Sequence, residues 1–179
     1  MIIDPTATSV ATLSAGLLVG RAVLGFAMAA HGAQKLFGWF GGHGLAGTAG
    51  FFEMLGFRPA RMFAFAAAAG ELVSGLLVAL GLLGPIGPAL ILALMIVAAL
   101  AVHWKHGFFA MTNGIELTVL YATGALTLAF TGYGAFSLDA LLGLDALASG
   151  PIAMLAIVFA TAAALGTLAL RRPTESPAA

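Results

Sequence analysis

The chain contains no cysteine and very little charge. Of its 179 residues, 8% are charged and 61% are hydrophobic. The absence of cysteine excludes disulfides, thiolate metal sites and thiol redox relays within this chain. Seven basic and seven acidic residues leave no basic tract for a nucleic-acid partner. A soluble domain of this size cannot bury so much apolar surface, so the chain is predicted to be an integral membrane protein.

Five long apolar stretches account for most of the chain. They lie at about residues 13–36, 62–83, 86–104, 115–131 and 152–170, and each is close to the roughly 20 residues that cross a bilayer as a helix. No lysine or arginine precedes Arg21, so the first stretch lacks the basic region of a secretory signal and is expected to be retained as a span. The pattern predicts an all-α, polytopic membrane helix bundle that forms one domain over residues 1–172 in the lipid bilayer, followed by a disordered tail at 173–179.

The basic residues near the span ends predict the orientation of the chain. Connections that carry lysine or arginine alternate with connections that carry none. By the positive-inside rule, the N-terminus is expected outside and the C-terminus in the cytoplasm. Short helices are predicted in the connections at 45–57 and 137–147, and a tight hairpin is predicted at Gly84-Pro85. The basic residues concerned are Lys35, Arg58, Arg61, Lys105, Arg171 and Arg172.

Ionisable side chains in the apolar stretches are the candidate functional residues, because a charge at membrane depth is costly unless it faces protein or water. Arg21 lies on the first stretch and Glu71 on the second. We expect them to form a structural ion pair, since two isolated charges cost more than one hydrogen-bonded pair. Whether this pair only fixes the helix register or also takes part in chemistry is left open by the residues.

A second group of ionisable residues is expected near the cytoplasmic side. His31 and Lys35 end the first stretch, His103 ends the third, and Glu116 begins the fourth. They are candidates for a ligand site, but simpler interpretations stay open: Lys35 would reach the interface by itself, and Glu116 has capping-box spacing after Asn113. The spacing fits neither a haem nor a zinc-ligand motif, so we expect no metal site and no covalently bound cofactor.

The order of these residues resembles the DoxX family of membrane proteins. Arg21 followed by His31-Gly32-Ala33-Gln34-Lys35-Leu36 is similar to the R…HGxxKL signature of that family. The resemblance implies a four-helix membrane bundle, to which the stretch 152–170 is added. DoxX/DoxD-like members are small membrane subunits of thiosulfate:quinone oxidoreductase, others belong to a complex with a sulfurtransferase and a superoxide dismutase, and a distant relative is the surfeit-locus cargo-receptor family. The similarity continues to residue 142 through Gly56-Phe57-Arg58-Pro59, Glu71, His103, Phe108-Phe109, Asn113-Gly114, Glu116 and Gly132-Tyr133-Gly134.

This resemblance implies a quinone-linked membrane subunit of an oxidoreductase complex in the bacterial plasma (inner) membrane, active in redox or sulfur metabolism or in oxidative-stress defence. A quinone would bind among His31, Lys35, Glu71, His103 and Glu116. Because the chain has no cysteine, its electrons would come from a partner subunit. Two alternatives stay open: a non-catalytic membrane scaffold or cargo-binding protein, and a small-molecule or proton-coupled transporter. Whether the chain is itself catalytic is also left open.

Overall fold

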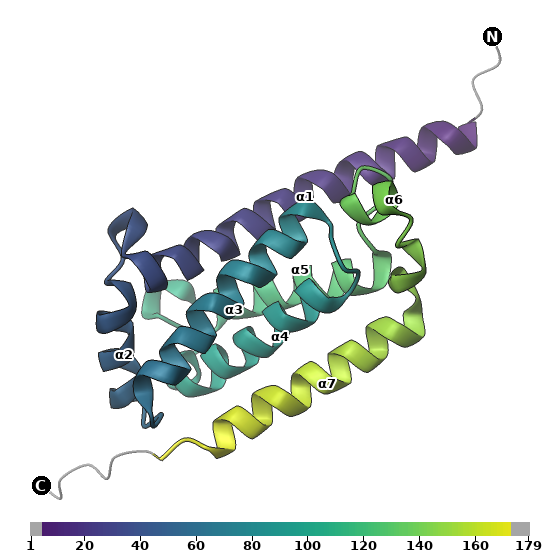
Figure 1. The fold of residues 1–179 in the computed structure, drawn as a ribbon. Coiled ribbons are helices and arrows are strands. Elements are labelled where there is room, and N and C mark those ends of the chain that lie inside the picture. The colour runs from purple at the N-terminus through teal and green to yellow at the C-terminus, as the bar shows by residue number, and fades with distance from the viewer. Residues whose placement is uncertain (1–4, 173–179) are drawn as a thin grey trace, which may run out of the picture.

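A computed structural model describes residues 5–172 of the chain (Figure 1). Helix accounts for 81% of the structure, and the described part contains no strand. The predicted all-α bundle is therefore confirmed, whereas the tail predicted at 173–179 lies outside the described residues. The long helices are α1 (Pro5–Phe37), α3 (Ala60–Leu80), α4 (Ile86–Ala98), α5 (Glu116–Thr131) and α7 (Gly150–Ala169), and the shorter α-helices are α2 (Gly44–Met54) and α6 (Leu138–Leu142).

Brief 3-10 and π-helical turns connect these helices. The π-helical turn η2 (Ala99–His103) extends α4, and the 3-10 turn η3 (Trp104–His106) follows it. The remaining 3-10 turns are η1 (Trp39–Gly41), η4 (Ala110–Thr112) and η5 (Asp145–Ala148). The π turn matters for the site described below, because its last residue is one of the candidate ligand residues.

The antiparallel helices α1 and α3 form the tightest pair, and glycine makes their close approach possible. A Cβ atom on Gly32 of α1 would lie 2.4 Å from the backbone nitrogen of Leu72, and one on Gly75 of α3 would lie 2.4 Å from that of Ala29. No side chain fits at such distances, so the two backbones touch. This contact fixes the offset between α1 and α3, and therefore decides which polar residues of the two helices meet.

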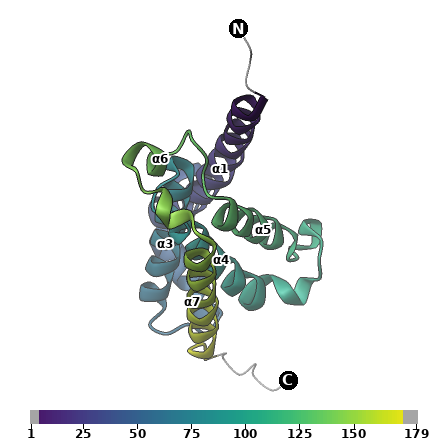
Figure 2. The ribbon, with the colours of Figure 1, turned by 90° about the vertical axis from the view of Figure 1, so that its right-hand side faces the viewer.

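α4 and α5 complete a four-helix bundle with α1 and α3, as Figure 2 shows. The centre of the bundle is filled by Met28, Val78, Ile91, Met95, Ala125, Leu128 and Tyr133. α7 lies outside this bundle and packs mainly along α4. Its end is held by the turn between α2 and α3, since Arg171 donates through Nε to the carbonyl of Leu55, and the backbone nitrogen of Arg172 donates to the carbonyl of Gly56 at 2.8 Å.

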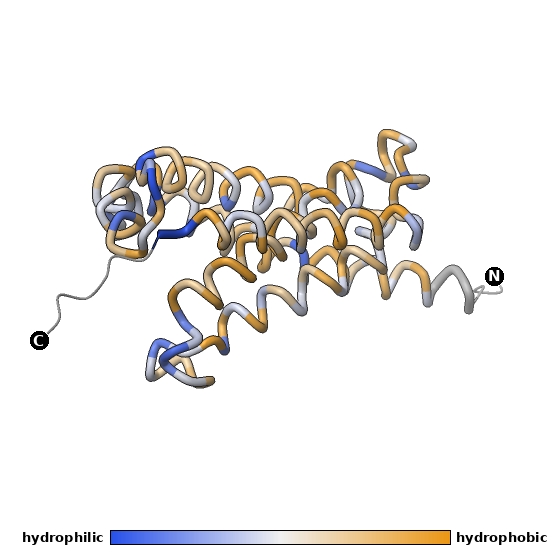
Figure 3. Tube along the Cα trace, turned by 90° about the horizontal axis from the view of Figure 1, so that it is seen from below, coloured by the Kyte–Doolittle hydropathy of each residue, from blue (hydrophilic) through white to orange (hydrophobic). Residues whose placement is uncertain are grey.

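Four helices are long and apolar enough to cross a membrane: Ser9–Phe37, Ala60–Leu80, Ile86–His106 and Gly150–Ala169. They correspond to the first, second, third and fifth predicted spans. The fourth, α5, is apolar but has only 16 residues, which is about 24 Å of helix. In Figure 3 the long helices are mainly hydrophobic, and most hydrophilic residues lie at the helix ends and in the connections.

One end of the bundle, which we call the basic end, carries the last turn of α1, α2, the start of α3, η3 and the end of α7 (Figure 1). Its lysines and arginines are Lys35, Arg58, Arg61, Lys105, Arg171 and Arg172. The predicted short helix at 45–57 is confirmed there as α2. The positively charged connections of the sequence therefore do gather on one side of the bundle.

At the opposite end, α6 is hydrogen-bonded to the hairpin between α3 and α4. Ser137 caps α6 by accepting a hydrogen bond from the nitrogen of Ala140 at 3.1 Å, as its sequence position predicts. The carboxylate of Asp139 accepts hydrogen bonds from the nitrogens of Leu83 at 2.8 Å and Gly84 at 2.7 Å. These contacts satisfy two backbone N–H groups at the predicted Gly84-Pro85 turn, and that of Gly84 would otherwise be buried without a partner.

Candidate functional site

The candidate site is a pocket of about 850 Å³ at the basic end. Residues from α1, α2, α3, α4 and α7 line it, together with the turns that follow α4. Most of the lining is apolar, and the polar side chains come from a small number of positions. This combination is typical of sites that hold a largely apolar small molecule by a few polar contacts. The polar and ionisable lining residues are Gln34, Lys35, His43, Thr48, Glu71, His103, Lys105, His106, Asn113 and Thr167.

An ion pair between Lys35 and Glu71 forms the charged part of the pocket. The Nζ atom of Lys35 donates to Oε1 of Glu71. The Glu71 side chain is only 6% exposed, whereas that of Lys35 is 35% exposed. The second carboxylate oxygen of Glu71, Oε2, is buried and has no hydrogen-bond partner within residues 5–172. The pair therefore offers an unused acceptor in the interior and a partly open ammonium group.

The expected pairing of Glu71 with Arg21 is wrong, and helix geometry explains why. The contact of Gly32 with Leu72 places Glu71 beside the last turns of α1. Arg21 lies eleven residues before Gly32, which is about 16 Å along the helix. Its guanidinium instead donates to the carbonyls of Ala79, through Nη1, and Phe136, through Nη2. Ala79 is in the last turn of α3, where unpaired carbonyls favour a cation.

His103 joins the pocket through the end of α4. Its Nδ1 atom lies 2.8 Å from the carbonyl oxygen of Asn113, which fits a hydrogen bond donated by the imidazole. Asn113 also lines the pocket. The backbone of Asn113 is left-handed, with φ of 64°, so it ends η4 instead of beginning α5. A π turn at this point changes the direction of His103 relative to a regular helix, and such turns are frequent at functional sites.

Two expected ligand residues lie outside the pocket lining. Glu116 accepts a hydrogen bond from the nitrogen of Ala110 at 2.8 Å and so secures the loop before α5. Its predicted capping box with Asn113 is wrong, because α5 starts at Glu116 itself. The side chain of His31 is exposed and meets Tyr121 of α5 edge to face, with ring centroids 6.0 Å apart. The structure therefore brings together Lys35, Glu71 and His103, but neither His31 nor Glu116.

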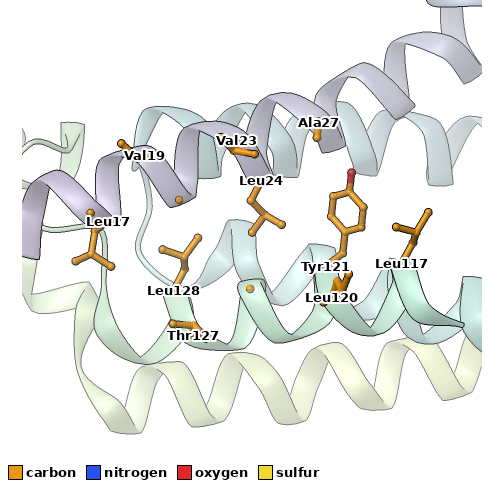
Figure 4. A pocket seen from close by; sticks show the side chains of 13 residues that line it. Leu17, Val19, Val23, Leu24, Ala27, Leu117, Leu120, Tyr121, Thr127 and Leu128 are labelled. Atoms are coloured by element: carbon orange, nitrogen blue, oxygen red, sulfur yellow. The ribbon is translucent and has the colours of Figure 1, made fainter. Parts of the chain in front are cut away.

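A second hollow, a groove of about 670 Å³, separates α1 from α5 (Figure 4). Tyr121 reaches across it from α5 towards Ala27, and the rest of the lining is almost entirely apolar, including Leu17, Leu24 and Leu128. This groove holds no charged side chain. It is therefore a weaker candidate for chemistry than the pocket at the basic end.

Tyr133 is the most perturbed ionisable residue outside the spans. Burial raises the pKa of its hydroxyl far above the usual range, and the nearby negative charge of Asp139 raises it further, while Arg21 acts in the opposite direction. The hydroxyl oxygen of Tyr133 and Nε of Arg21 are both buried without a hydrogen-bond partner in the described part of the chain. Tyr133 and Arg21 belong to the end of the bundle remote from the pocket.

Several pocket residues could not be identified from the sequence. His43 lies in a glycine-rich segment that carries no spacing signal, and His106 follows Trp104 and Lys105, a pair typical of membrane interfaces. The α7 residues Ala163, Ala164 and Thr167 also line the pocket, although nothing in an apolar alanine-rich span distinguishes them. Within residues 5–172, no group of three or more His, Asp or Glu side chains is arranged to hold a metal ion.

Comparison with known proteins identifies the family. Residues 16–104 match the DoxX family model, and this segment contains the three candidate residues that share the pocket, Lys35, Glu71 and His103. The similarity noted between residues 105 and 142 lies outside the matched segment. No match was found among curated proteins or among solved structures. The matched segment and the bundle of apolar helices together establish that the chain is a membrane protein of the DoxX family.

Proposed function

We propose that this protein is a quinone-binding membrane subunit of an oxidoreductase complex, and that the quinone ring binds in the pocket at the basic end. The observation that carries the proposal is the Lys35–Glu71 pair, because it places a buried acceptor without a partner beside a partly open ammonium group. A quinone needs a flat apolar space for its ring and polar groups at its two carbonyl oxygens. The apolar space for the ring is lined by α4 residues such as Leu94 and Ala98.

The polar side chains of the pocket are suited to proton transfer during reduction of a quinone. Reduction of a quinone to a quinol takes up two electrons and two protons, one proton at each carbonyl oxygen. Lys35 can donate a hydrogen bond to one oxygen and stabilise negative charge as it develops there. His103 and Glu71 can exchange protons with the ring, since both lie at the pocket surface. The two electrons come from a partner subunit, as the chain contains no thiol of its own.

The proposal includes an orientation, with the basic end in the cytoplasm of a bacterial plasma membrane. The absence of cysteine makes this simple to test, because any introduced thiol is unique. Glu53→Cys, exposed on α2, should react with a membrane-impermeant maleimide only after the cells are opened. Asp145→Cys, exposed at the other end, should react in intact cells. The reverse pattern would contradict the orientation.

Quinone binding is best tested with the purified protein in lipid nanodiscs. A decyl-tailed benzoquinone should raise the Tm of the wild type in a saturable way. Glu71→Gln and Lys35→Met should weaken the apparent affinity by about tenfold or more, equivalent to about 1.4 kcal/mol. Glu53→Gln removes a carboxylate that is exposed and outside the pocket, so it should bind as the wild type does. A wild type that no quinone stabilises, or equal binding by all four proteins, would refute the proposal.

A further inference from the structure

The pocket is much longer than a ring-binding site needs to be. Along α4 and its continuation it runs from His103 to Leu90, thirteen residues or about 20 Å. Lys35 and Glu71 contribute the charge from the α1 and α3 side. On the other side the lining continues past α4 to Ala163 and Thr167 of α7. One continuous space therefore connects the ion pair inside the bundle with a crevice between α3 and α7.

The crevice between α3 and α7 is suited to an apolar chain and not to a polar group. Its α3 wall is formed by Ala66 and Gly70 and its α4 floor by Leu90 and Ala93. On the α7 wall, the hydroxyl of Thr167 donates to the carbonyl of Ala163 at 2.9 Å, so it is already used within its own helix. A ligand lying there would find shape and dispersion contacts but no free hydrogen-bond donor.

The crevice also opens sideways. α7 packs along α4 but makes little contact with α3, and Figure 1 shows α7 set apart from α3 along its length. The residues that follow α7, Arg171 and Arg172, hydrogen-bond to Leu55 and Gly56 at the turn between α2 and α3. Both helices are long and apolar enough to span a membrane, so the opening between them faces the lipid.

We propose that the pocket takes a membrane-dissolved amphiphile, with its polar ring at the Lys35–Glu71 pair and a single hydrocarbon tail that leaves through the crevice between α3 and α7. This inference rests on the proposed function and specifies its ligand class: a quinone with a hydrocarbon tail. It also gives α7, which lies outside the matched family segment, a role in selecting the ligand. α7 acts as one wall of the tail path and does not touch the reacting ring.

The test compares two quinones with the same ring, one with a decyl tail and one without a tail, in nanodiscs at matched lipid-phase concentrations. Ala163→Phe should narrow the crevice from the α7 side, and Ala66→Phe from the α3 side. Ala163 and Ala66 are both exposed, so a larger side chain does not disturb the core. Ala162→Phe is the matched control, because Ala162 is exposed and absent from the pocket lining.

We expect each crevice variant to weaken binding of the decyl-tailed quinone by about tenfold and to leave the tailless quinone within about twofold of the wild type. The Ala162→Phe control should leave both affinities unchanged. Equal effects on the two quinones, or no effect of either crevice variant, would overturn the tail path while the ring site stands. Failure of the wild type to bind either quinone would instead overturn the proposed function, and the tail path with it.

Discussion

Substitution of Gly32 by alanine should destabilise the protein through a single methyl group. The added Cβ atom would lie 2.4 Å from the backbone nitrogen of Leu72 and 2.7 Å from the carbonyl oxygen of Ala68. Ordinary contact begins at about 3.4 Å, so α1 and α3 would have to separate by about 1 Å. Because the obstacle is backbone, no change of rotamer can relieve it.

The magnitude follows from two opposing effects. Overpacking that moves backbone costs up to about 3 kcal/mol. Alanine is a better helix former than glycine by about 1 kcal/mol, which offsets part of that cost. The free energy of unfolding should therefore fall by about 2 kcal/mol, which for a chain of this length corresponds to a fall in Tm of about 4–8 °C. The same displacement would also move Lys35, one turn further along α1, away from Glu71.

Thermal unfolding in one detergent, followed by circular dichroism, measures this effect. Gly20→Ala provides the control on the same helix, because a Cβ atom there has no neighbour within 4 Å. Only the gain in helix propensity remains for Gly20→Ala, so its Tm should stay the same or rise slightly. If Gly32→Ala were as stable as Gly20→Ala, the close backbone contact between α1 and α3 would be refuted.

Three further predictions concern the polar contacts. Lys35→Met should lower the free energy of unfolding by about 1–3 kcal/mol, less than for a fully buried pair because Lys35 is partly open. The double variant with Glu71→Leu should recover most of this stability, and additive losses in a double-mutant cycle would contradict the pair. Asp139→Ala leaves two backbone N–H groups of the α3–α4 hairpin without an acceptor and should lower the free energy of unfolding by about 1–3 kcal/mol. Removal of the exposed Asp145 carboxylate should change the free energy of unfolding little. Tyr133 should remain protonated in the folded protein above pH about 10, where a tyrosine in the unfolded chain ionises. Its raised pKa therefore contributes stability at lower pH that is lost as pH rises beyond that value. A phenolate absorbance at 295 nm that appears near pH 10, in a variant that lacks the other tyrosine, would show that Tyr133 is not buried.

The long helices could be predicted because hydropathy alone encodes them. Runs of about 20 apolar residues leave the backbone no other way to satisfy its hydrogen bonds in lipid, and four of the five predicted spans are long enough to cross. The end of α3 was set by Gly81, which adopts φ of 69°, so this helix stops short of the predicted residue 83. The residue type and position of Ser137 predict the cap that it forms on α6. These features depend on local sequence.

The partner of Glu71 could not be predicted, because it depends on how two helices are offset. Arg21 and Lys35 lie on the same helix, and the sequence favours Arg21 as the partner of Glu71. The backbone contact at Gly32 instead places Lys35 beside Glu71. The same limit applies to His31, whose ring meets Tyr121 of another helix. Topology predicts His31, Lys35, His103 and Glu116 at one depth, and of these Lys35 and His103 line the pocket. Depth follows from the chain order, whereas direction around a helix follows from packing.

The short α5 has a consequence for the membrane around the protein. Its 16 residues cover about 24 Å, about 6 Å less than a typical hydrocarbon core. The segments Ser9–Phe37, Ala60–Leu80, Ile86–His106 and Gly150–Ala169 are each long enough to cross that core, so α5 is the short side of the protein's perimeter. We expect lipids beside α5 to thin locally, and hydrophobic mismatch to grow in thicker bilayers. The Tm should therefore fall as the acyl chains of the nanodisc lipid are lengthened, and a Tm independent of chain length would show that α5 and its preceding loop together match the bilayer.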